Sequence, residues 1–170
     1  DANRDPCFVA GTMHDIGKGV MVNSYPGLFP MILGEMRRQN WQVPMIVVER
    51  ELAGGLTHAV AGELLIRKWG MEGQLGNAVL SHHKPRADDA LSILVAIADL
   101  VGQLLYPFPK EAKTPLREAV EEDRLADAND FLPEGLLSEG PLTLAELQSL
   151  LKALPANVRR LAEEARRSIA

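Results

Sequence analysis

The sequence predicts an all-α domain, because apolar positions recur three and four residues apart along most of the chain and few stretches alternate with period two. The chain has 170 residues, which suits one domain of ordinary size, and its hydrophobic content of 46% is enough for a core. We therefore expect one helical bundle.

The N-terminal part is expected to hold a short helix that leads into His14, followed by helices over 27–40 and 43–52. Within the last of these, the run "MIVV" could also form a strand, since β-branched residues favour strands. The segment "HDIGKG" is expected to be a glycine-broken turn that carries Lys18.

A stronger helical pattern covers 58–69. Thr57 is a suitable N-cap for this helix, and Gly70 is suited to end it. Its apolar positions are expected to lie along one buried face: Ala61, Leu64, Leu65 and Trp69.

Two more helices complete the central part of the chain. A helix over 72–83 must end before Pro85, because the residue that precedes a proline is disfavoured in the helical region. Asp88 or Asp89 is then expected to cap a long apolar helix over 91–105.

Beyond Tyr106 the composition changes to short acidic segments separated by prolines, and we expect a connector with one or two short helices. We therefore divide the chain into a helical core, 1–106, and a part, 107–170, whose connector and C-terminal helices pack on the same domain. The prolines that mark the connector are Pro107, Pro109, Pro115, Pro133 and Pro141.

The end of the chain is expected to be helical again. Thr143 and Glu146 have the spacing of a capping box, and Pro155 is expected at the start of a helix over 154–170. Charged residues four apart on this helix favour a solvated face over a partner-binding one: Arg159, Arg160, Glu163, Glu164 and Arg167.

The bulk charge and composition exclude some classes of partner. A net charge of −5 argues against a nucleic-acid partner. The most apolar stretch, 91–105, contains Asp99 and is shorter than the ~20 apolar residues that span a bilayer. The N-terminus lacks the pattern of a secretory signal, and the one cysteine, Cys7, cannot form an internal disulfide, so we expect a cytoplasmic protein.

The candidate functional residues are histidines and aspartates. A single histidine at a helix end is more often a core or surface residue than a ligand, but all four histidines of this chain are expected at helix ends: His14, His58, His82 and His83. Helical folds assemble metal sites from imidazole and carboxylate side chains that project inward from several helices. The set therefore favours a metal site over four unrelated residues.

Two aspartates extend this set. Adjacent helical residues point about 100° apart, so Asp15 and His14 cannot lie on one stripe of a helix, but both can border a single pocket at the helix end. Asp99 interrupts the apolar run "ILVAIADLVGQ", where an ionised carboxylate is costly unless it is paired or bound to a metal. A buried carboxylate bonded to a backbone or arginine donor is the other interpretation.

Four separated motifs in one order resemble the HDOD domain, a branch of the HD superfamily found in bacterial signalling proteins. They are "GTMHDIGK", "THAVAGELLIRKWG", "AVLSHHKP" and "LVAIADLVGQ", and the resemblance runs from about Phe8 to Leu105. It implies an HD-domain-like helical bundle. Domains of the HD superfamily normally have helices before the His-Asp pair, one of which supplies a further histidine ligand that HDOD domains commonly lack. These helices are expected to be missing from this chain.

The resemblance also implies a ligand set for one or two divalent transition metal ions. Three imidazoles and a carboxylate suit iron, zinc, nickel or manganese. Asp15 would bridge two metals; His58, His82 and His83 would complete one site with it; His14 and Asp99 would serve the other, which would also use the missing upstream histidine.

The catalytic residues of an active relative would correspond to Asp15 and Lys18. In HD phosphohydrolases a lysine at the position of Lys18 can lie near the substrate phosphate, although a solvated turn lysine is the simpler interpretation. Relatives that hydrolyse cyclic dinucleotides carry a Gly-Tyr-Pro signature soon after the paired histidines, whereas this chain reads "HHKPRADDA". That activity is disfavoured.

Three functions stay open at this stage. The first is a regulatory module of bacterial signal transduction that binds a protein partner or a small phosphate-containing ligand. The second is a metal-dependent phosphohydrolase that acts on a nucleotide or another phosphoester, and the third is a helical interaction domain without a metal. The first is favoured because few basic residues could face substrate beyond Lys18, Lys84 and Arg86.

Overall fold

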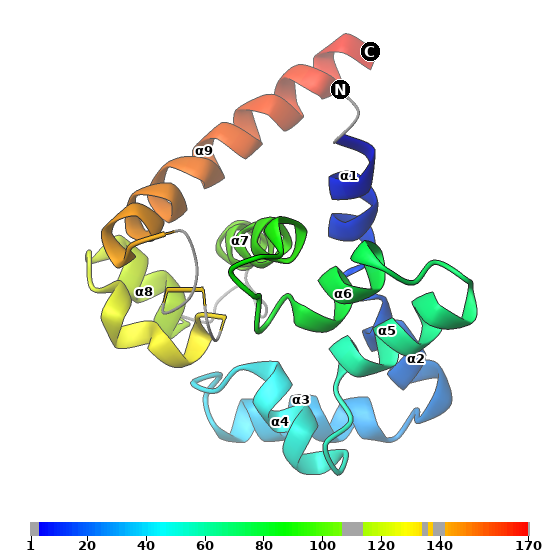
Figure 1. Cartoon of the computed structure of the whole chain (residues 1–170). Helices are drawn as coiled ribbons and strands as arrows, with labels where there is room; N and C mark the ends of the chain where they lie inside the picture. The colour runs from blue at the N-terminus through cyan, green and yellow to red at the C-terminus, as the bar shows by residue number, and fades with distance from the viewer. Residues whose placement is uncertain (1–3, 107–113, 134–135, 138–141, 170) are drawn as a thin grey trace.

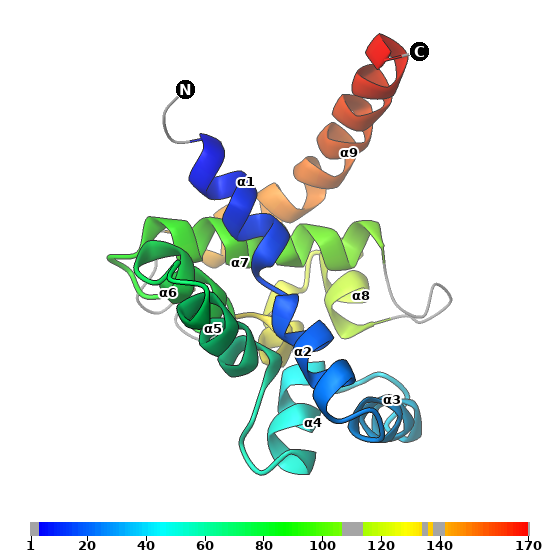
Figure 2. The ribbon, with the colours of Figure 1, turned by 90° about the vertical axis from the view of Figure 1, so that its right-hand side faces the viewer.

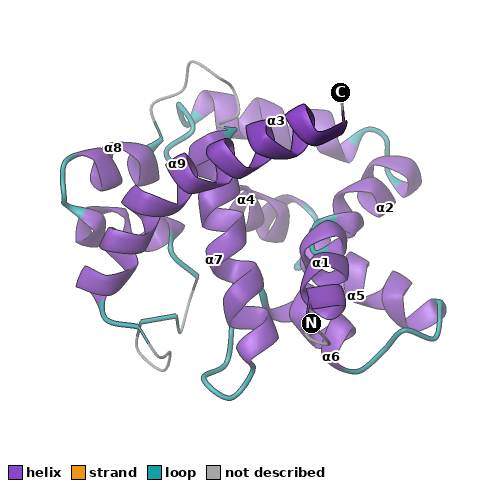
Figure 3. Cartoon of the chain, turned by 90° about the horizontal axis from the view of Figure 1, so that it is seen from above, coloured by secondary structure: helices purple, strands orange, loops and turns teal. Residues whose placement is uncertain are grey.

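The computed structural model describes residues 4–106, 114–133, 136–137 and 142–169. Within these ranges the chain forms helices and no strand (Figure 3), which confirms the predicted all-α class. The ambiguous run "MIVV" is helical. Among the described residues, no helix has both the length and the apolar character needed to cross a membrane.

The elements follow one another around a central helix, α7, which Figure 1 shows end-on. In Figure 2, α1 crosses α7, and the two helices are in contact. The elements are α1 (Arg4–Met13), α2 (Ile16–Ser24), α3 (Leu28–Arg38), α4 (Met45–Leu52), α5 (His58–Lys68), α6 (Gln74–Ser81), α7 (Ala90–Leu105), α8 (Pro115–Glu121), the 3-10 helix η1 (Leu125–Phe131) and α9 (Leu144–Ile169).

Three apolar clusters hold these helices together. Met21, Ile32 and Val48 join α2, α3 and α4 on one side of the molecule. The small residues Ala10 and Ala78 close the contact of α1 and α6 with α7. The largest cluster covers the opposite side of α7, where residues of α7 pack with residues of α8, η1 and α9 and with two leucines that follow η1. Its buried members are Ile93, Leu100, Val101, Leu116, Val120, Leu125, Leu132, Leu136, Leu147 and Leu151.

The expected turn around Lys18 is wrong, because Ile16 begins α2 and Lys18 lies in its first helical turn. Gly17 is not a helix breaker here. A Cβ atom at this position would lie 1.8 Å from the carbonyl oxygen of His58, so the glycine allows α2 to pack backbone to backbone against α5. Gly17 therefore serves a close helix contact.

The expected buried face of α5 is also wrong in part. Leu64 and Trp69 are 54% and 52% exposed. The buried residues of the helix are mostly small and lie toward α2 and α6: His58, Ala59, Ala61, Gly62 and Ile66. Two close helix neighbours leave no room for large side chains, so small residues mark the buried face.

The predicted caps are confirmed. Thr57 accepts a hydrogen bond from the backbone N–H of Val60 and begins α5. Asp89, rather than Asp88, caps α7 by accepting from the backbone N–H of Ser92.

The N-terminus of α9 is the predicted capping box. The carboxylate of Glu146 accepts from the backbone N–H of Thr143 at 2.8 Å, and the Thr143 hydroxyl accepts from the backbone N–H of Glu146 at 3.3 Å. Pro155, however, lies inside α9 and does not begin a helix. Because Leu147 and Leu151 anchor the preceding turns in the core, the helix is established before the proline is reached.

The connector contains the two short helical segments that were expected, α8 and η1. On the later turns of α9, Arg160 and Glu164 form one of the predicted four-apart ion pairs, at 2.8 Å. The proposed boundary between 106 and 107 adjoins residues that lie outside the described ranges, and it stays a prediction.

Candidate metal centre

The structure brings all six predicted ligand residues together, five of them at or next to the ends of helices and Asp99 from within α7. His14 and Asp15 lie between α1 and α2, and His58 is the first residue of α5. The remaining three come from the end of α6 and from within α7. The nitrogen and carboxylate atoms form two compact groups: His58, His82 and His83, and His14, Asp15 and Asp99.

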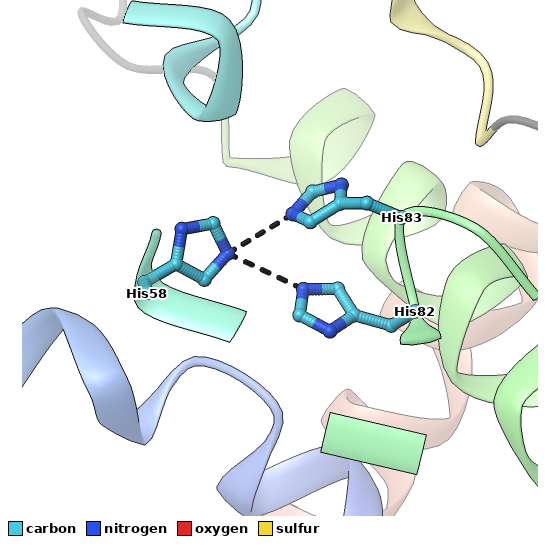
Figure 4. Close-up of side chains that lie close together, drawn as sticks. All are labelled: His58, His82 and His83. Atoms are coloured by element: carbon cyan, nitrogen blue, oxygen red, sulfur yellow. Dashed lines mark hydrogen bonds between the residues drawn. The ribbon is translucent and has the colours of Figure 1, made fainter. Parts of the chain in front are cut away.

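The first group consists of three imidazole rings that point toward one another (Figure 4). Nε2 of His58 lies 3.3 Å from Nε2 of His82 and 3.0 Å from Nε2 of His83. His58 and His82 are each only 1% exposed. The three nitrogen atoms therefore face a common point that is largely shielded from solvent.

Hydrogen bonds on the far side of two of these rings decide where their protons are. Nδ1 of His82 lies 2.8 Å from the carbonyl oxygen of Val79, which can only accept, so this nitrogen carries the proton. Nδ1 of His58 likewise faces the carboxylate of Glu49 at 2.6 Å. In the neutral rings, Nε2 of both residues then carries a lone pair that points toward the other imidazoles of the three-histidine group.

The electrostatics keep two of the rings neutral near pH 7. Burial lowers the pKa of His82 to about 4, with a further contribution from His58. Burial also lowers the pKa of His83 to about 3, and His82 and His58 add to this effect. Neutral imidazole is the form that binds a metal.

In the second group, the proton arrangement repeats at His14. Its Nδ1 donates to the carbonyl oxygen of Gly11 at 2.7 Å, which leaves Nε2 as a lone pair. This Nε2 is buried and has no hydrogen-bond partner among the described residues. It lies 3.5 Å from a carboxylate oxygen of Asp15 and 3.6 Å from one of Asp99.

The neighbouring carboxylates and the burial of His14 shift its pKa in opposite directions. Burial lowers the pKa of His14, but Asp99 and Asp15 outweigh burial, so that the pKa lies above its usual value of 6.5. The site thus favours a positive charge at the position where Nε2 of His14 faces the two carboxylates.

Asp15 lies between the two groups. It occupies the N-cap position of α2 but accepts no capping hydrogen bond, because its side chain is turned toward the site. One oxygen lies 3.3 Å from Nε2 of His58 and the other 2.6 Å from Nζ of Lys18. Burial raises the pKa of Asp15, but Lys18, His14 and His58 outweigh burial and hold it below its usual value.

Asp99 lies on the site-facing side of α7. Its Oδ2 accepts from the side-chain amide of Gln103 at 3.0 Å, and its Oδ1 faces His14. Burial raises the pKa of Asp99, but His14, His83 and His82 outweigh burial and hold the pKa well below its usual range. The carboxylate is ionised and faces imidazoles, as a metal ligand would be.

Sequence reasoning missed one residue of the centre, Glu49. This glutamate of α4 is 0% exposed, and its carboxylate bonds both the ring and the backbone of His58. The available signal was an acidic residue that directly follows the apolar run "MIVV", but an amphipathic surface helix has the same pattern. Only the packing of α4 against the start of α5 distinguishes the two.

A cavity of about 530 Å³ opens beside the centre. His58, His83, Asp99 and Lys18 form part of its wall, and Lys84 and Arg50 add two further cations. The second basic residue suggested after the histidines, Arg86, is instead paired with Asp88 at 3.0 Å. The remaining wall is mainly apolar and aromatic and includes Trp41, Val43, Met45, Tyr106 and Phe131.

Comparison with known proteins gives one match. The family model of the HDOD domain matches residues 1–85, a range that includes Lys18 and five of the six candidate ligands and ends before Asp99. No curated protein and no solved structure matches the chain.

Proposed function

Because the chain belongs to the HDOD domain family, we propose that it is a regulatory module of bacterial signal transduction whose His/Asp pocket binds a divalent transition metal. One observation carries the metal proposal. Nε2 of His58 and Nε2 of His82 lie 3.3 Å apart, and Nδ1 of each ring donates to a protein oxygen, so that in the neutral tautomers both Nε2 atoms carry lone pairs. Two facing lone pairs repel unless a cation lies between them.

The donor set fits such an ion. Imidazole nitrogens and carboxylate oxygens together suit iron, zinc, nickel or manganese. His58, His82 and His83 would hold one ion with Asp15, and His14 and Asp99 would hold a second one, again with Asp15. The buried Nε2 of His14, which has no hydrogen-bond partner in the described part of the chain, supports the second position. A bound metal ion would lower the pKa of a water ligand and stabilise charge on a phosphate oxygen.

The test is elemental analysis of the purified protein after desalting without a chelator. We expect a near-stoichiometric transition metal in the wild type and its loss in the His58→Ala and Asp15→Ala variants. Asp88→Ala is the matched control, because Asp88 is an exposed aspartate that pairs only with Arg86 among the described residues. Absence of metal from the wild type, even after reconstitution with each candidate ion, would contradict the proposal.

A second candidate function is metal-dependent phosphoester hydrolysis, and the cavity favours it. Its volume of about 530 Å³ is sufficient for a small ligand, and Lys18, Lys84 and Arg50 would face an anionic group there. Asp15 and Lys18 would be the catalytic residues: Asp15 as a metal ligand, and Lys18 as a cation for the phosphate. The apolar wall would accept the rest of a nucleotide or another phosphoester.

Release of inorganic phosphate from a panel of nucleotides and simple phosphoesters separates the two functions. A hydrolase would lose turnover in Lys18→Met while it keeps its metal. A regulatory module would bind a phosphate-containing ligand, or a protein partner from its pathway, and release no phosphate from any of them.

A further inference from the structure

We propose that Glu49 is a positioning residue of the metal centre, and that its buried carboxylate holds the proton of His58 on Nδ1 so that Nε2 is left as a lone pair for the ion. The inference rests on the metal site proposed above and assigns a role to a residue outside the predicted ligand set. The carboxylate of Glu49 hydrogen-bonds to His58 through both the ring and the backbone of that residue.

The contact is short and doubly anchored. Oε2 of Glu49 accepts from Nδ1 of His58 at 2.6 Å and from the backbone N–H of His58 at 2.9 Å. His58 is the first residue of α5, so this backbone N–H is one of those that have no acceptor within their own helix. One carboxylate oxygen therefore fixes both the backbone and the ring of the same residue.

Burial of Glu49 is hard to explain by stability alone. Its side chain is 0% exposed, whereas its neighbours Arg50 and Glu51 are exposed. Removal of a carboxylate from water costs several kcal/mol unless its oxygens are fully bonded. Oε1 of Glu49 has no hydrogen-bond partner among the described residues, so this compensation is incomplete. An apolar side chain would pack at this position at lower cost, but it could not orient His58.

The expected effect on the centre follows from the chemistry of imidazole. A carboxylate that accepts from one ring nitrogen fixes the tautomer and makes the other nitrogen a better metal ligand. Without Glu49 the proton of His58 could move to Nε2, where it would face Asp15, His82 and His83 and occupy the position of the ion.

The proton position can be measured without any metal. Long-range ¹⁵N–¹H spectra of chelator-treated protein with ¹⁵N-labelled histidine report which ring nitrogen carries the proton, and His58→Gln identifies the signals of His58. In the wild type we expect the Nδ1–H form of His58. In Glu49→Gln, which retains the shape of the side chain and loses its charge, we expect the Nε2–H form to become detectable.

Zinc binding provides the second readout, by competition with a chromophoric chelator. We expect Glu49→Gln to bind Zn²⁺ about 10- to 100-fold more weakly than the wild type, the range typical of a lost carboxylate partner of a ligand histidine. Glu51→Gln is the matched control, since Glu51 is an exposed glutamate of the same helix, and it should bind as the wild type does.

Two results would overturn the role of Glu49. One is a wild-type His58 that carries its proton on Nε2, which decides the question even if Glu49→Gln does not fold. The other is zinc affinity in folded Glu49→Gln within twofold of the Glu51→Gln control. A wild type that binds no zinc or other ion would instead contradict the proposed metal site, and the tautomer of His58 would still decide the role of Glu49.

Discussion

Gly17 and His58 are in backbone contact: a Cβ atom on Gly17 would lie 1.8 Å from the carbonyl oxygen of His58 and 2.5 Å from the backbone nitrogen of Gly62. Neither partner atom belongs to a flexible side chain, so neither can move aside. The close approach of α2 to α5 sets the position of Asp15, just before α2, relative to His58, the first residue of α5. The geometry of the metal centre thus depends on a glycine that is not itself one of the candidate ligands.

Gly17→Ala should therefore separate α2 from α5 and weaken the centre. We expect a loss of about 3 kcal/mol or more in the free energy of unfolding, since overpacking against backbone cannot relax locally. Chemical denaturation and zinc titration measure both effects. Gly19→Ala is the control, because the same helix has open space at Gly19, and it should be neutral or stabilising by ~0.5–1 kcal/mol. Equal behaviour of the two variants would refute the contact.

The two ligand groups should respond differently to single substitutions. His83→Gln removes a nitrogen from the three-histidine group and should weaken the tighter zinc-binding event about tenfold or more. Asp99→Asn should leave that event nearly unchanged and weaken the second one, because Asp99 faces His14. Calorimetric titration of zinc into metal-free protein separates the events. Identical loss of both events in both variants would indicate one inseparable site.

Metal-free protein should lose stability as the pH falls from 6.5 toward 4. The folded-state pKa values of His82 and His83 lie near 4 and 3, below the ordinary 6.5, so in this range the unfolded chain binds more protons than the folded one. His14 has a raised pKa and acts in the opposite sense, as a contribution present below pH 6.5 and lost above its folded pKa. His82 and His83 together lower the free energy of unfolding as the pH falls by more than His14 raises it, so the net effect is a loss of stability.

The corresponding measurement is urea denaturation of chelator-treated protein at several pH values between 7 and 4. Each extra proton bound by the unfolded chain contributes a slope of at most ~1.4 kcal/mol per pH unit. His82→Gln should flatten the curve, since it removes one of the two groups. A free energy of unfolding that is constant or rises toward pH 4 would show that protonation of the buried imidazoles does not destabilise the folded protein.

Pro155→Ala should stabilise α9. A proline inside a helix lacks the N–H for one backbone hydrogen bond and costs ~3 kcal/mol relative to alanine. We expect the substitution to raise the free energy of unfolding by about 1–2 kcal/mol, which is part of that cost. Chemical denaturation measures this gain, and circular dichroism should show increased helical content. If a helix instead began at Pro155, as its position after Leu154 suggested, the substitution would be neutral or destabilising.

The helical class and most helix ends follow from local patterns. The caps at Thr57, Asp89 and Thr143 depend on residues three positions apart, which the sequence displays directly. The ligand candidates were also visible, because each is a histidine or aspartate at a helix end or within an apolar run. The four histidines at helix ends already favoured one metal site, but the assignment of the six residues to two groups came only from the resemblance to a family, since neither spacing nor composition brings α1, α5, α6 and α7 together.

Contacts between distant segments decided the rest. Gly17 resembles a turn glycine until α5 lies against it, and the buried face of α5 consists of small residues because two helices crowd it. By its sequence pattern Glu49 resembles a surface residue of an amphipathic helix, and only the folded structure shows that its carboxylate bonds His58, nine residues later in the chain. In each case the partner lies on another helix, so the residues adjacent in the sequence cannot predict the contact. Periodicity and capping therefore predicted the helices, and packing between helices determined which glycine, which face and which carboxylate serve the site.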